Sequence, residues 1–438
     1  MTYTRFAGLR GSHRFGGATQ VSRAFIGATA LAGALALSIG CSDDGVAAGS
    51  GGSGGSAGSG GSSGGSAGSA GSGGSSAGSA GSAGNGGGGA GGEASGPSGT
   101  LRVLSTGPEL RAPTTAAVRG DNLWVVNGQL GGLFGGAPPV LPFNVVSVPL
   151  AGGAVGATTI ELPGDGFYPE GIASSSDGTL FVGSLPLGTV VRVAADSTTA
   201  TPFVAAGVAE RGVVGLEVDE ARELLWFCDT NPVATVPGGA IVGVSLEDGS
   251  EVVRHAMPNR DSVGGDAGTS PPGDAGTDDG GTPAEPAPGA PTFCNDLIVD
   301  STGNLFATDS TGRIFRVPAA GATTANSASV WLDVPEIGAP TPGGFGANGL
   351  DIVGGSLVII NIGSGSLVAV DPSSADPAST VRTIRLTLDG APATLCGPDG
   401  LETVPGSATD VVVIENGGCT NPPGGDGDRV VRVTLDLD

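Results

Sequence analysis

One pattern of strands recurs along the chain beyond residue 113, and no other feature of the sequence constrains the fold as strongly. Each copy has a short apolar strand, a turn rich in Asp and Gly, a second strand and a third strand that alternates Val or Arg. Six copies follow one another, mostly about 45 to 55 residues apart. Their first strands begin at Pro113, Tyr168, Val214, Phe293, Ala347 and Gly397. Such repeats build propeller blades, and ring closure removes exposed sheet edges, so residues 101–438 are predicted to be an all-β, six-bladed β-propeller.

One interval between copies is longer than the others because residues 261–291 interrupt it. This insert is rich in Gly, Pro, Ala and Asp and has no apolar period, so we predict that it is disordered. It precedes the innermost strand of the next blade and is expected on the face where the first strands begin. There it is either a passive insertion or a lid over the pore mouth.

Residues 1–40 have the features of a bacterial lipoprotein signal peptide. Four arginines precede an apolar stretch, residues 24–39, that is too short to span a bilayer. The stretch leads into Cys41, and the run Leu-Ser-Ile-Gly-Cys resembles a lipobox with Cys41 as the lipidated residue. Ordinary signal-peptide cleavage with an incidental Cys41 is the alternative. We expect an exported protein that is lipid-anchored in the bacterial cell envelope, at the outer membrane or the periplasmic face.

Residues 41–100 separate this leader from the repeats and are nearly all Gly, Ser and Ala. Such a composition cannot offset its ordering entropy, so the segment is predicted to be a disordered tether. A flexible coil of about 55 residues has a root-mean-square reach of about 40 Å. That reach holds a domain clear of a membrane surface.

The formal charge of −24, without a single lysine, argues against nucleic-acid binding. Affinity for phosphate backbones depends on clustered Lys and Arg. The acidic residues either solvate the surface or attract a cationic partner. The lipid anchor is the one membrane contact we expect, and we expect a monomer.

Five cysteines carry information about the compartment. If Cys41 is lipidated, the other four form an even set in an oxidising environment, where pairing is the default. Three pairings are possible, and we favour Cys396 with Cys419 and Cys228 with Cys294. None has Cys-x-x-Cys spacing, so zinc is not expected.

Four polar residues share one position in the repeat, where the chain turns into the innermost strand. They are Glu170, Asn295, Asn348 and Asp399, in copies two, four, five and six. In a ring with quasi-rotational symmetry, residues at one register point to a common place on the axis. Two carboxylates and two amide carbonyls suit Ca²⁺ completed by water. The alternative is that each residue serves its own turn, since Asn-Gly, Asp-Gly and Pro-Glu-Gly are common turn sequences.

The short sequence motifs around these residues resemble those of a known superfamily, which includes gluconolactonases, senescence marker proteins, paraoxonases and diisopropyl fluorophosphatases. They are Pro169-Glu170-Gly171, the run from Asn295 to Leu305, Asn348-Gly349-Leu350 and Pro398-Asp399-Gly400-Leu401. The resemblance covers nearly the whole propeller. It implies a six-bladed ring whose central Ca²⁺ is held by a Glu, two Asn and an Asp and serves hydrolysis of lactones or phosphotriesters.

The resemblance also assigns roles to individual residues. Ca²⁺ would polarise a carbonyl or phosphoryl oxygen, and Asp399 is the candidate nucleophile or general base. Family variants take an acidic ligand from the end of the second strand, which makes Asp229, Asp309 and Asn361 second-tier pore candidates. Alternatively, these three cap the strand-end turns of their own blades.

The chain departs from the family in its histidines. Paraoxonases use a histidine pair near the metal, whereas this chain has only His13, in the leader, and His255, beside the insert. We expect His255 at the surface, which disfavours a histidine dyad. Glu217 and Glu402 follow first-strand starts and either line the pore or occupy solvated or ion-paired positions.

These observations favour a calcium-dependent hydrolase of the lactonase or esterase type that acts on a small ester or lactone outside the cytoplasm. The alternative from another class is a non-catalytic, calcium-stabilised propeller that binds a peptide, glycan or cell-wall component. A third reading is an enzyme lost to drift, whose empty pore would hold no metal.

Overall fold

The computed structural model describes residues 96–230, 238–260, 291–341, 343–417 and 427–438, which all belong to one compact unit. The predicted signal peptide with Cys41, most of the tether, the insert up to residue 290 and Cys419 lie outside the described residues. Within these ranges no helix is long and apolar enough to cross a membrane. The helices found there are short 3₁₀ turns: η1 (Leu130–Phe134), η2 (Ala319–Gly321), η3 (Pro335–Ile337) and η4 (Pro377–Thr380).

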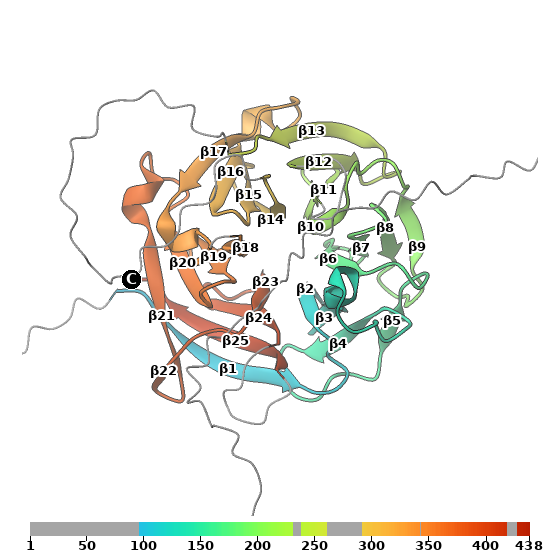
Figure 1. The fold of residues 1–438 in the computed structure, drawn as a ribbon, viewed down its shortest axis with the longest axis horizontal. Helices are drawn as coiled ribbons and strands as arrows, with labels where there is room; N and C mark the ends of the chain where they lie inside the picture. The colour runs from blue at the N-terminus through green and yellow to red at the C-terminus, as the bar shows by residue number, and fades with distance from the viewer. Residues whose placement is uncertain (1–95, 231–237, 261–290, 342, 418–426) are drawn as a thin grey trace, which may run out of the picture. The chain divides into compact units, whose positions relative to one another are not determined.

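Four sheets of four antiparallel strands follow one another around a ring (Figure 1). The first two sheets contain β2 (Pro113–Arg119), β3 (Asn122–Asn127), β4 (Asn144–Pro149) and β5 (Thr159–Glu161), then β6 (Pro169–Ser174), β7 (Leu180–Ser184), β8 (Val190–Val193) and β9 (Thr201–Val204). The next two contain β10 (Val213–Asp219), β11 (Leu224–Asp229), β12 (Gly239–Ser245) and β13 (Glu251–Met257), then β14 (Cys294–Val299), β15 (Leu305–Asp309), β16 (Arg313–Val317) and β17 (Ser329–Asp333). Every first strand lies where the sequence repeat predicts it.

The remaining strands form one sheet of nine, where the sequence predicts two separate blades. One run of the sheet is β18 (Ala347–Val353), β19 (Ser356–Asn361), β20 (Ser366–Val370) and β21 (Arg382–Leu388), with β22 (Ala391–Ala393) beside β21. The other run is β23 (Pro398–Thr403), β24 (Asp410–Asn416), β25 (Asp428–Asp436) and β1 (Ser98–Thr106). The runs merge because β1 pairs antiparallel with β25 along one edge and parallel with β21 along the other. β1 also begins within the last three residues assigned to the tether.

The first strand of each run contacts its neighbours in a closed cycle around the axis. The cycle runs through β2, β6, β10, β14, β18 and β23 and returns to β2. Apolar side chains fill the space between adjacent sheets; for example, Phe181, Val190 and Leu225 belong to one buried cluster that joins the second and third sheets. The molecule is therefore an all-β, propeller-like ring whose core lies between sheets and whose axis is lined by first strands.

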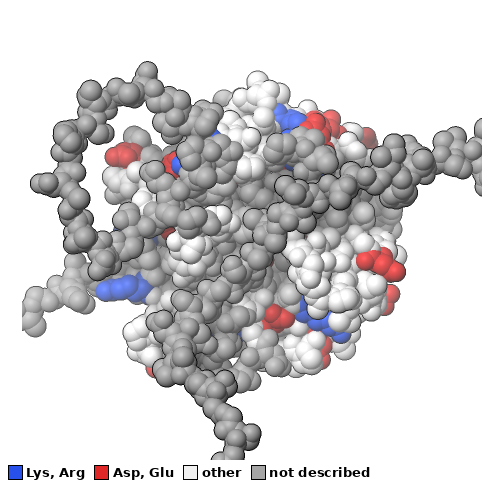
Figure 2. Space-filling model, viewed as in Figure 1, with Lys and Arg blue, Asp and Glu red and all other residues white. Residues whose placement is uncertain are grey.

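On the face drawn in Figure 2, the visible charged side chains of the described residues are dispersed. Figure 2 shows Arg and Asp or Glu side chains in small, mixed groups around the ring, with uncharged residues between them. In this view the described residues do not gather their charges into one patch.

Candidate metal centre

The four predicted ligands occupy the same place in four first strands. Each first strand has a register irregularity after its first paired residue, for example between Pro169 and Ile172 of β6. A bulge of this kind re-aims the side chain it contains. The residue that follows the first pair is Thr114, Glu170, Val214, Asn295, Asn348 or Asp399 in β2, β6, β10, β14, β18 and β23, respectively. The shared register predicted from the repeat is therefore present in the structure.

Glycine follows three of these ligands because the neighbouring first strand comes very close. A Cβ atom on Gly171 would lie 2.0 Å from the Val214 carbonyl oxygen, and one on Gly349 would lie 2.6 Å from the Asp399 carbonyl oxygen. Real Cβ atoms do not approach so near, so these positions need glycine. The glycine in the dipeptides Glu-Gly, Asn-Gly and Asp-Gly is thus required by close strand packing at the axis as well as being common in turns.

One small cavity brings all four residues together. Glu170, Asn295, Asn348 and Asp399 line it, along with Asp296. Its volume is about 10 Å³, close to that of one water-sized sphere. The four predicted ligands are 4–8% exposed. The cavity is thus suited in size to a single ion rather than to a substrate.

Neighbouring side chains orient two of the oxygen donors. Asn295 donates from Nδ2 to Ser310 Oγ at 3.1 Å, which leaves its carbonyl oxygen for the cavity. Asn416 donates from Nδ2 to Asp399 Oδ2 at 2.7 Å, and Asn348 also hydrogen-bonds the Asp399 carboxylate. The buried Oδ1 of Asn416 has no hydrogen-bond partner among the described residues, so it can accept a bond from an added water.

The carboxyl groups at the cavity repel one another and are poorly solvated. Burial raises the pKa of Asp399 to about 7, although hydrogen bonds from Asn348 and Asn416 oppose the shift. Burial also raises the pKa of Glu170 well above its usual range, and the charges of Asp399 and Asp296 add to the effect. For Asp296, burial brings the pKa to about 7 against hydrogen bonds from the Leu297 and Leu350 amides. A cation at this place would relieve the repulsion.

Three further carboxyls lie on first strands but do not line the cavity. Burial raises the pKa values of Glu217, Asp351 and Glu402, and mutual repulsion adds to the shifts of Glu217 and Glu402. The Asp351 carboxylate accepts a bond from the Thr403 amide at 2.6 Å, which opposes its shift. The sequence singles out Glu217 and Glu402 but not Asp296 or Asp351. One sequence signal does point to Asp296: it directly follows Asn295, whereas glycine follows each of the other three predicted ligands.

The donor set fits a hard cation only if the amides take part. Within the described ranges, no three His, Cys, Asp or Glu side chains form a group that could hold a metal ion by themselves. Glu170 and Asp399 supply two carboxylates, so any metal held here also depends on Asn295 and Asn348. Oxygen-only donors of mixed charge suit Ca²⁺.

The second-tier pore candidates belong to a different set of residues, at the ends of the second strands, which we call the strand-end clasp. Its members end or nearly end each second strand: Asn127, Ser184, Asp229, Asp309, Asn361 and Glu415. Each pairs with the first paired residue of its first strand and hydrogen-bonds the segment that precedes that strand. None of the six lines the cavity.

The oxygens of Asp229, Asp309 and Asn361 are occupied within their own sheets. Asp229 accepts bonds from the Glu210, Arg211 and Gly212 amides and pairs with Arg254 at 2.5 Å. Asp309 accepts a bond from the Phe293 amide at 3.0 Å and pairs with Arg313. Asn361 Oδ1 accepts bonds from the Gly363 and Ser364 amides at 3.1 and 3.2 Å, and its Nδ2 donates to the carbonyls of Glu336 and Gly338. The structure thus places these three in turns and not at the axis.

His255 is buried, so the expectation of a surface position is wrong. The Ser327 amide donates to its Nδ1, which leaves Nε2–H to donate to the Ala322 carbonyl at 2.9 Å. Burial lowers the pKa of this imidazole. The ring packs against Trp226, with ring centroids 5.9 Å apart, and is not among the residues that line the cavity. It serves the core between β13 and the segment after β16.

A disulfide joins Cys228 to Cys294, the pairing that the sequence favours. Cys228 directly precedes Asp229 of the clasp, and Cys294 directly precedes Asn295 of the cavity. The bond therefore ties the third sheet to the first strand of the fourth. Cys396 is also disulfide-bonded.

Fold and cavity together define an all-β propeller-like protein with a candidate metal centre on its axis. At the sequence level, the strictosidine synthase-like, N-terminal family matches residues 155–193, a segment that contains Glu170. No curated protein matches the chain in sequence.

Solved structures are similar in fold. A calcium-binding protein, regucalcin, from Agrobacterium tumefaciens is 14% identical, with a TM-score of 0.49 over 76% of this chain and 94% of that one. Virginiamycin B lyase from Staphylococcus aureus is 12% identical, with a TM-score of 0.47 over 77% of this chain and all of that one. An aldose sugar dehydrogenase from Streptomyces coelicolor is 15% identical, with a TM-score of 0.43 over 77% and 98%.

Proposed function

We propose that Glu170, Asn295, Asn348 and Asp399 hold one Ca²⁺ ion and that the protein hydrolyses small esters or lactones with it. The observation that carries the proposal is the convergence of these four oxygen donors, at one register of four first strands, on a cavity of about 10 Å³. Among the described residues, no Lys, Arg or His side chain lines the cavity. An added cation is the simplest way to neutralise this set.

The same proposal counts six blades. The two runs of the nine-stranded sheet are then the fifth and sixth blades, and β1 supplies the outermost strand of the sixth. Two observations support this count: six first strands contact one another in a closed cycle, and the strand-end clasp occurs six times. Closing the ring with a strand from each end of the domain leaves no unpaired edge at the junction.

In the proposed reaction, Asp399 is the group that handles the proton or attacks the substrate carbon. Its carboxylate is held by two amides, from Asn348 and Asn416, so one oxygen keeps a fixed direction. Ca²⁺ held by Glu170, Asn295, Asn348 and Asp399 would supply a Lewis acid for the carbonyl oxygen and would lower the pKa of a water beside it. Burial of Glu170 and Asn295 excludes bulk water, which strengthens every electrostatic interaction at the site.

The leader and tether predicted from the sequence give this activity a place. We propose export and attachment through a lipid on Cys41, with no nucleic-acid partner and with the domain acting as a monomer. Metabolic labelling with a radioactive fatty acid tests the anchor, because Cys41→Ala abolishes labelling if the lipobox is used. Retained labelling in that variant would exclude Cys41 as the site.

The test of the proposed function combines metal analysis with turnover. Purified protein is assayed for bound calcium and for hydrolysis of a panel of lactones and aryl esters, before and after chelation. We expect about one Ca²⁺ per chain and turnover that is lost on chelation and returns with Ca²⁺. Bound calcium without turnover of any substrate would remove the hydrolase.

A specific observation favours a second candidate, the non-catalytic, calcium-stabilised propeller that binds a peptide, glycan or cell-wall component. His255, the one histidine in the described part of the chain, is committed to the core and cannot serve the axis. Asp399→Asn separates the two candidates when metal content is retained. Lost turnover supports the hydrolase, whereas unchanged turnover removes Asp399 as nucleophile or base.

A further inference from the structure

A second, larger pocket lies between the second and third sheets, at the strand ends away from the candidate metal centre. Its volume is about 710 Å³, within the range of small-molecule sites. Glu170 stands near the start of β6, whereas Ser175 and Ser176 of the pocket directly follow the end of that strand. Glu220 likewise directly follows β10. The pocket is therefore separate from the axial cavity.

The basic side of the pocket is Arg192, an exposed residue of β8. Its guanidinium carbon lies 5.5 Å from the centroid of the Phe203 ring, which holds the group by a cation–π contact. Among the described residues the guanidinium has no carboxylate partner and no side-chain hydrogen bond. Its planar fork is free to bind a carboxylate with two parallel hydrogen bonds.

The acidic side of the pocket is Glu220, with Asp177 nearby. Glu220 Oε1 accepts a bond from the Ser176 amide at 2.6 Å, and Asp177 Oδ1 accepts bonds from Ser175 Oγ at 2.6 Å and the Thr179 amide at 2.8 Å. These bonds lower the pKa values of both carboxyls, so both are ionised at neutral pH. A carboxylate accepts about four hydrogen bonds, so Glu220 retains capacity for a ligand.

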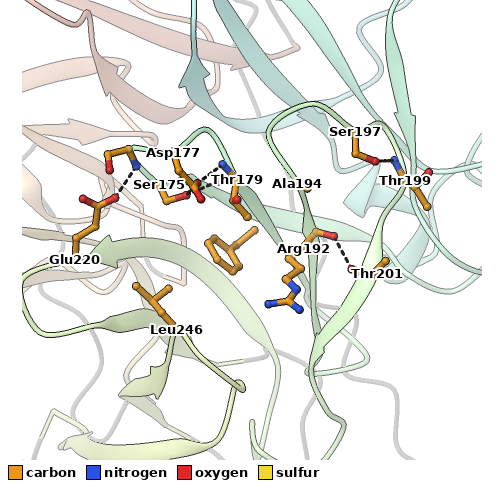
Figure 3. A pocket seen from close by; sticks show the side chains of 12 residues that line it. Ser175, Asp177, Thr179, Arg192, Ala194, Ser197, Thr199, Thr201, Glu220 and Leu246 are labelled. Carbon is orange, nitrogen blue, oxygen red and sulfur yellow. Dashed lines mark hydrogen bonds between the residues drawn. The ribbon is translucent and has the colours of Figure 1, made fainter.

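Figure 3 shows the Glu220 carboxylate at one end of the group of lining side chains and the Arg192 guanidinium nearer its middle, with Ser197 and Thr199 at the other end. Phe181 and Leu246 also line the pocket and offer apolar surface. We propose that this pocket binds a small zwitterion, a free amino acid or a short peptide, with its carboxylate on Arg192, its ammonium group on Glu220 and an apolar side chain against Phe181 and Leu246. The inference does not depend on calcium or on hydrolysis.

Titration calorimetry of the full chain tests the pairing of charges from the ligand side. The probes are L-phenylalanine and the dipeptide L-alanyl-L-phenylalanine, which distinguish an amino acid from a peptide. We expect saturable binding of at least one probe, with its N-acetylated and its C-amidated forms each about tenfold weaker, since each loses a charge-assisted bond. If neither probe binds, or if both capped forms bind as well as the zwitterion, the proposal is overturned.

Substitutions test the same pairing from the protein side. Arg192→Met should weaken binding of the zwitterion about tenfold and leave binding of the C-amidated probe unchanged. Glu220→Gln should weaken binding of the zwitterion about tenfold and leave binding of the N-acetylated probe unchanged. Glu247→Gln is the matched control. It removes the same charge as Glu220→Gln, but Glu247 is an exposed neighbour of Leu246 that does not line the pocket. Equal weakening by Glu247→Gln and Glu220→Gln would overturn the inference. Ester turnover and calcium binding are expected to be unchanged in all three variants.

Discussion

The strand-end clasp and the candidate metal centre lie side by side at one end of the sheets, yet their polar groups are treated in opposite ways. In β14, Cys294 pairs with clasp residue Asp309, and the next residue is Asn295 of the cavity. Asp309 is fully buried and meets an arginine and backbone amides. Glu170 and Asp399 are almost as buried but face other carboxyls. Buried charge is normally paired, so the unpaired set is the one that marks a ligand site.

Removing a clasp carboxylate should have the largest effect on stability. Asp229→Ala leaves Arg254 without its 2.5 Å partner and leaves three backbone amides unsatisfied. We expect the free energy of unfolding to fall by about 3–5 kcal/mol. Urea titration measures the change. Calcium affinity should hardly change, because the third sheet has Val214 at the ligand position; a large loss of affinity would show that clasp and centre are one unit.

The disulfide connects the two regions, so its loss should affect both. Replacing Cys228 and Cys294 together by Ser opens a loop of 66 residues. A cross-link over such a loop contributes about 2–4 kcal/mol by restricting the unfolded chain. We expect a loss of that order in urea titration together with weaker calcium binding, since Asn295 follows Cys294. Unchanged stability would mean that strand pairing alone sets the position of β14.

A substitution in the centre should change stability in the opposite direction. Asp399→Asn removes a buried carboxylate whose pKa is about 7, above its ordinary value of 3.8, so the metal-free protein should gain about 4 kcal/mol at pH 8. The same change should weaken calcium binding about 100-fold, because the site loses half its formal charge. Thermal melts with and without Ca²⁺ measure both effects. Destabilisation of the metal-free protein would place Asp399 among the clasp-like, satisfied groups.

The pH dependence of the metal-free protein follows from the same contrast. The folded pKa values of Asp296 and Asp399, about 7, lie above the ordinary value of 3.8, so the folded state binds more protons than the unfolded state between these pH values. This contribution to stability is complete below about pH 4, falls as the pH rises and is lost above about pH 7. Calcium should remove the loss, so its stabilising effect is expected to be larger at pH 8 than at pH 5. An equal effect at both values would contradict the assignment.

The sequence repeat anticipated the first strands and the shared register because both depend on local pattern. The position of Glu170, Asn295, Asn348 and Asp399 follows from counting within each copy. The single sheet of nine strands in place of two predicted blades could not be read in this way, because it depends on pairing of β1 with β21 and β25, hundreds of residues away.

Contacts between different sheets also could not be predicted from the sequence. The sequence predicts an exposed His255 because it lies near the polar insert, yet the segment around Ala322 and Ser327 covers it. Asp351 is half-buried because β18 packs against β14 and β23. The pocket at Arg192 requires the turns of two sheets to meet, which no single copy of the repeat records.

The most direct test of the central claim is a long-wavelength anomalous difference map from crystals grown with Ca²⁺. We expect one calcium peak within coordination distance of Glu170, Asn295, Asn348 and Asp399, and no such peak in crystals of Asp399→Asn grown at the same low calcium concentration. A wild-type map with calcium bound elsewhere, and with the four side chains hydrogen-bonded only to one another, would contradict it.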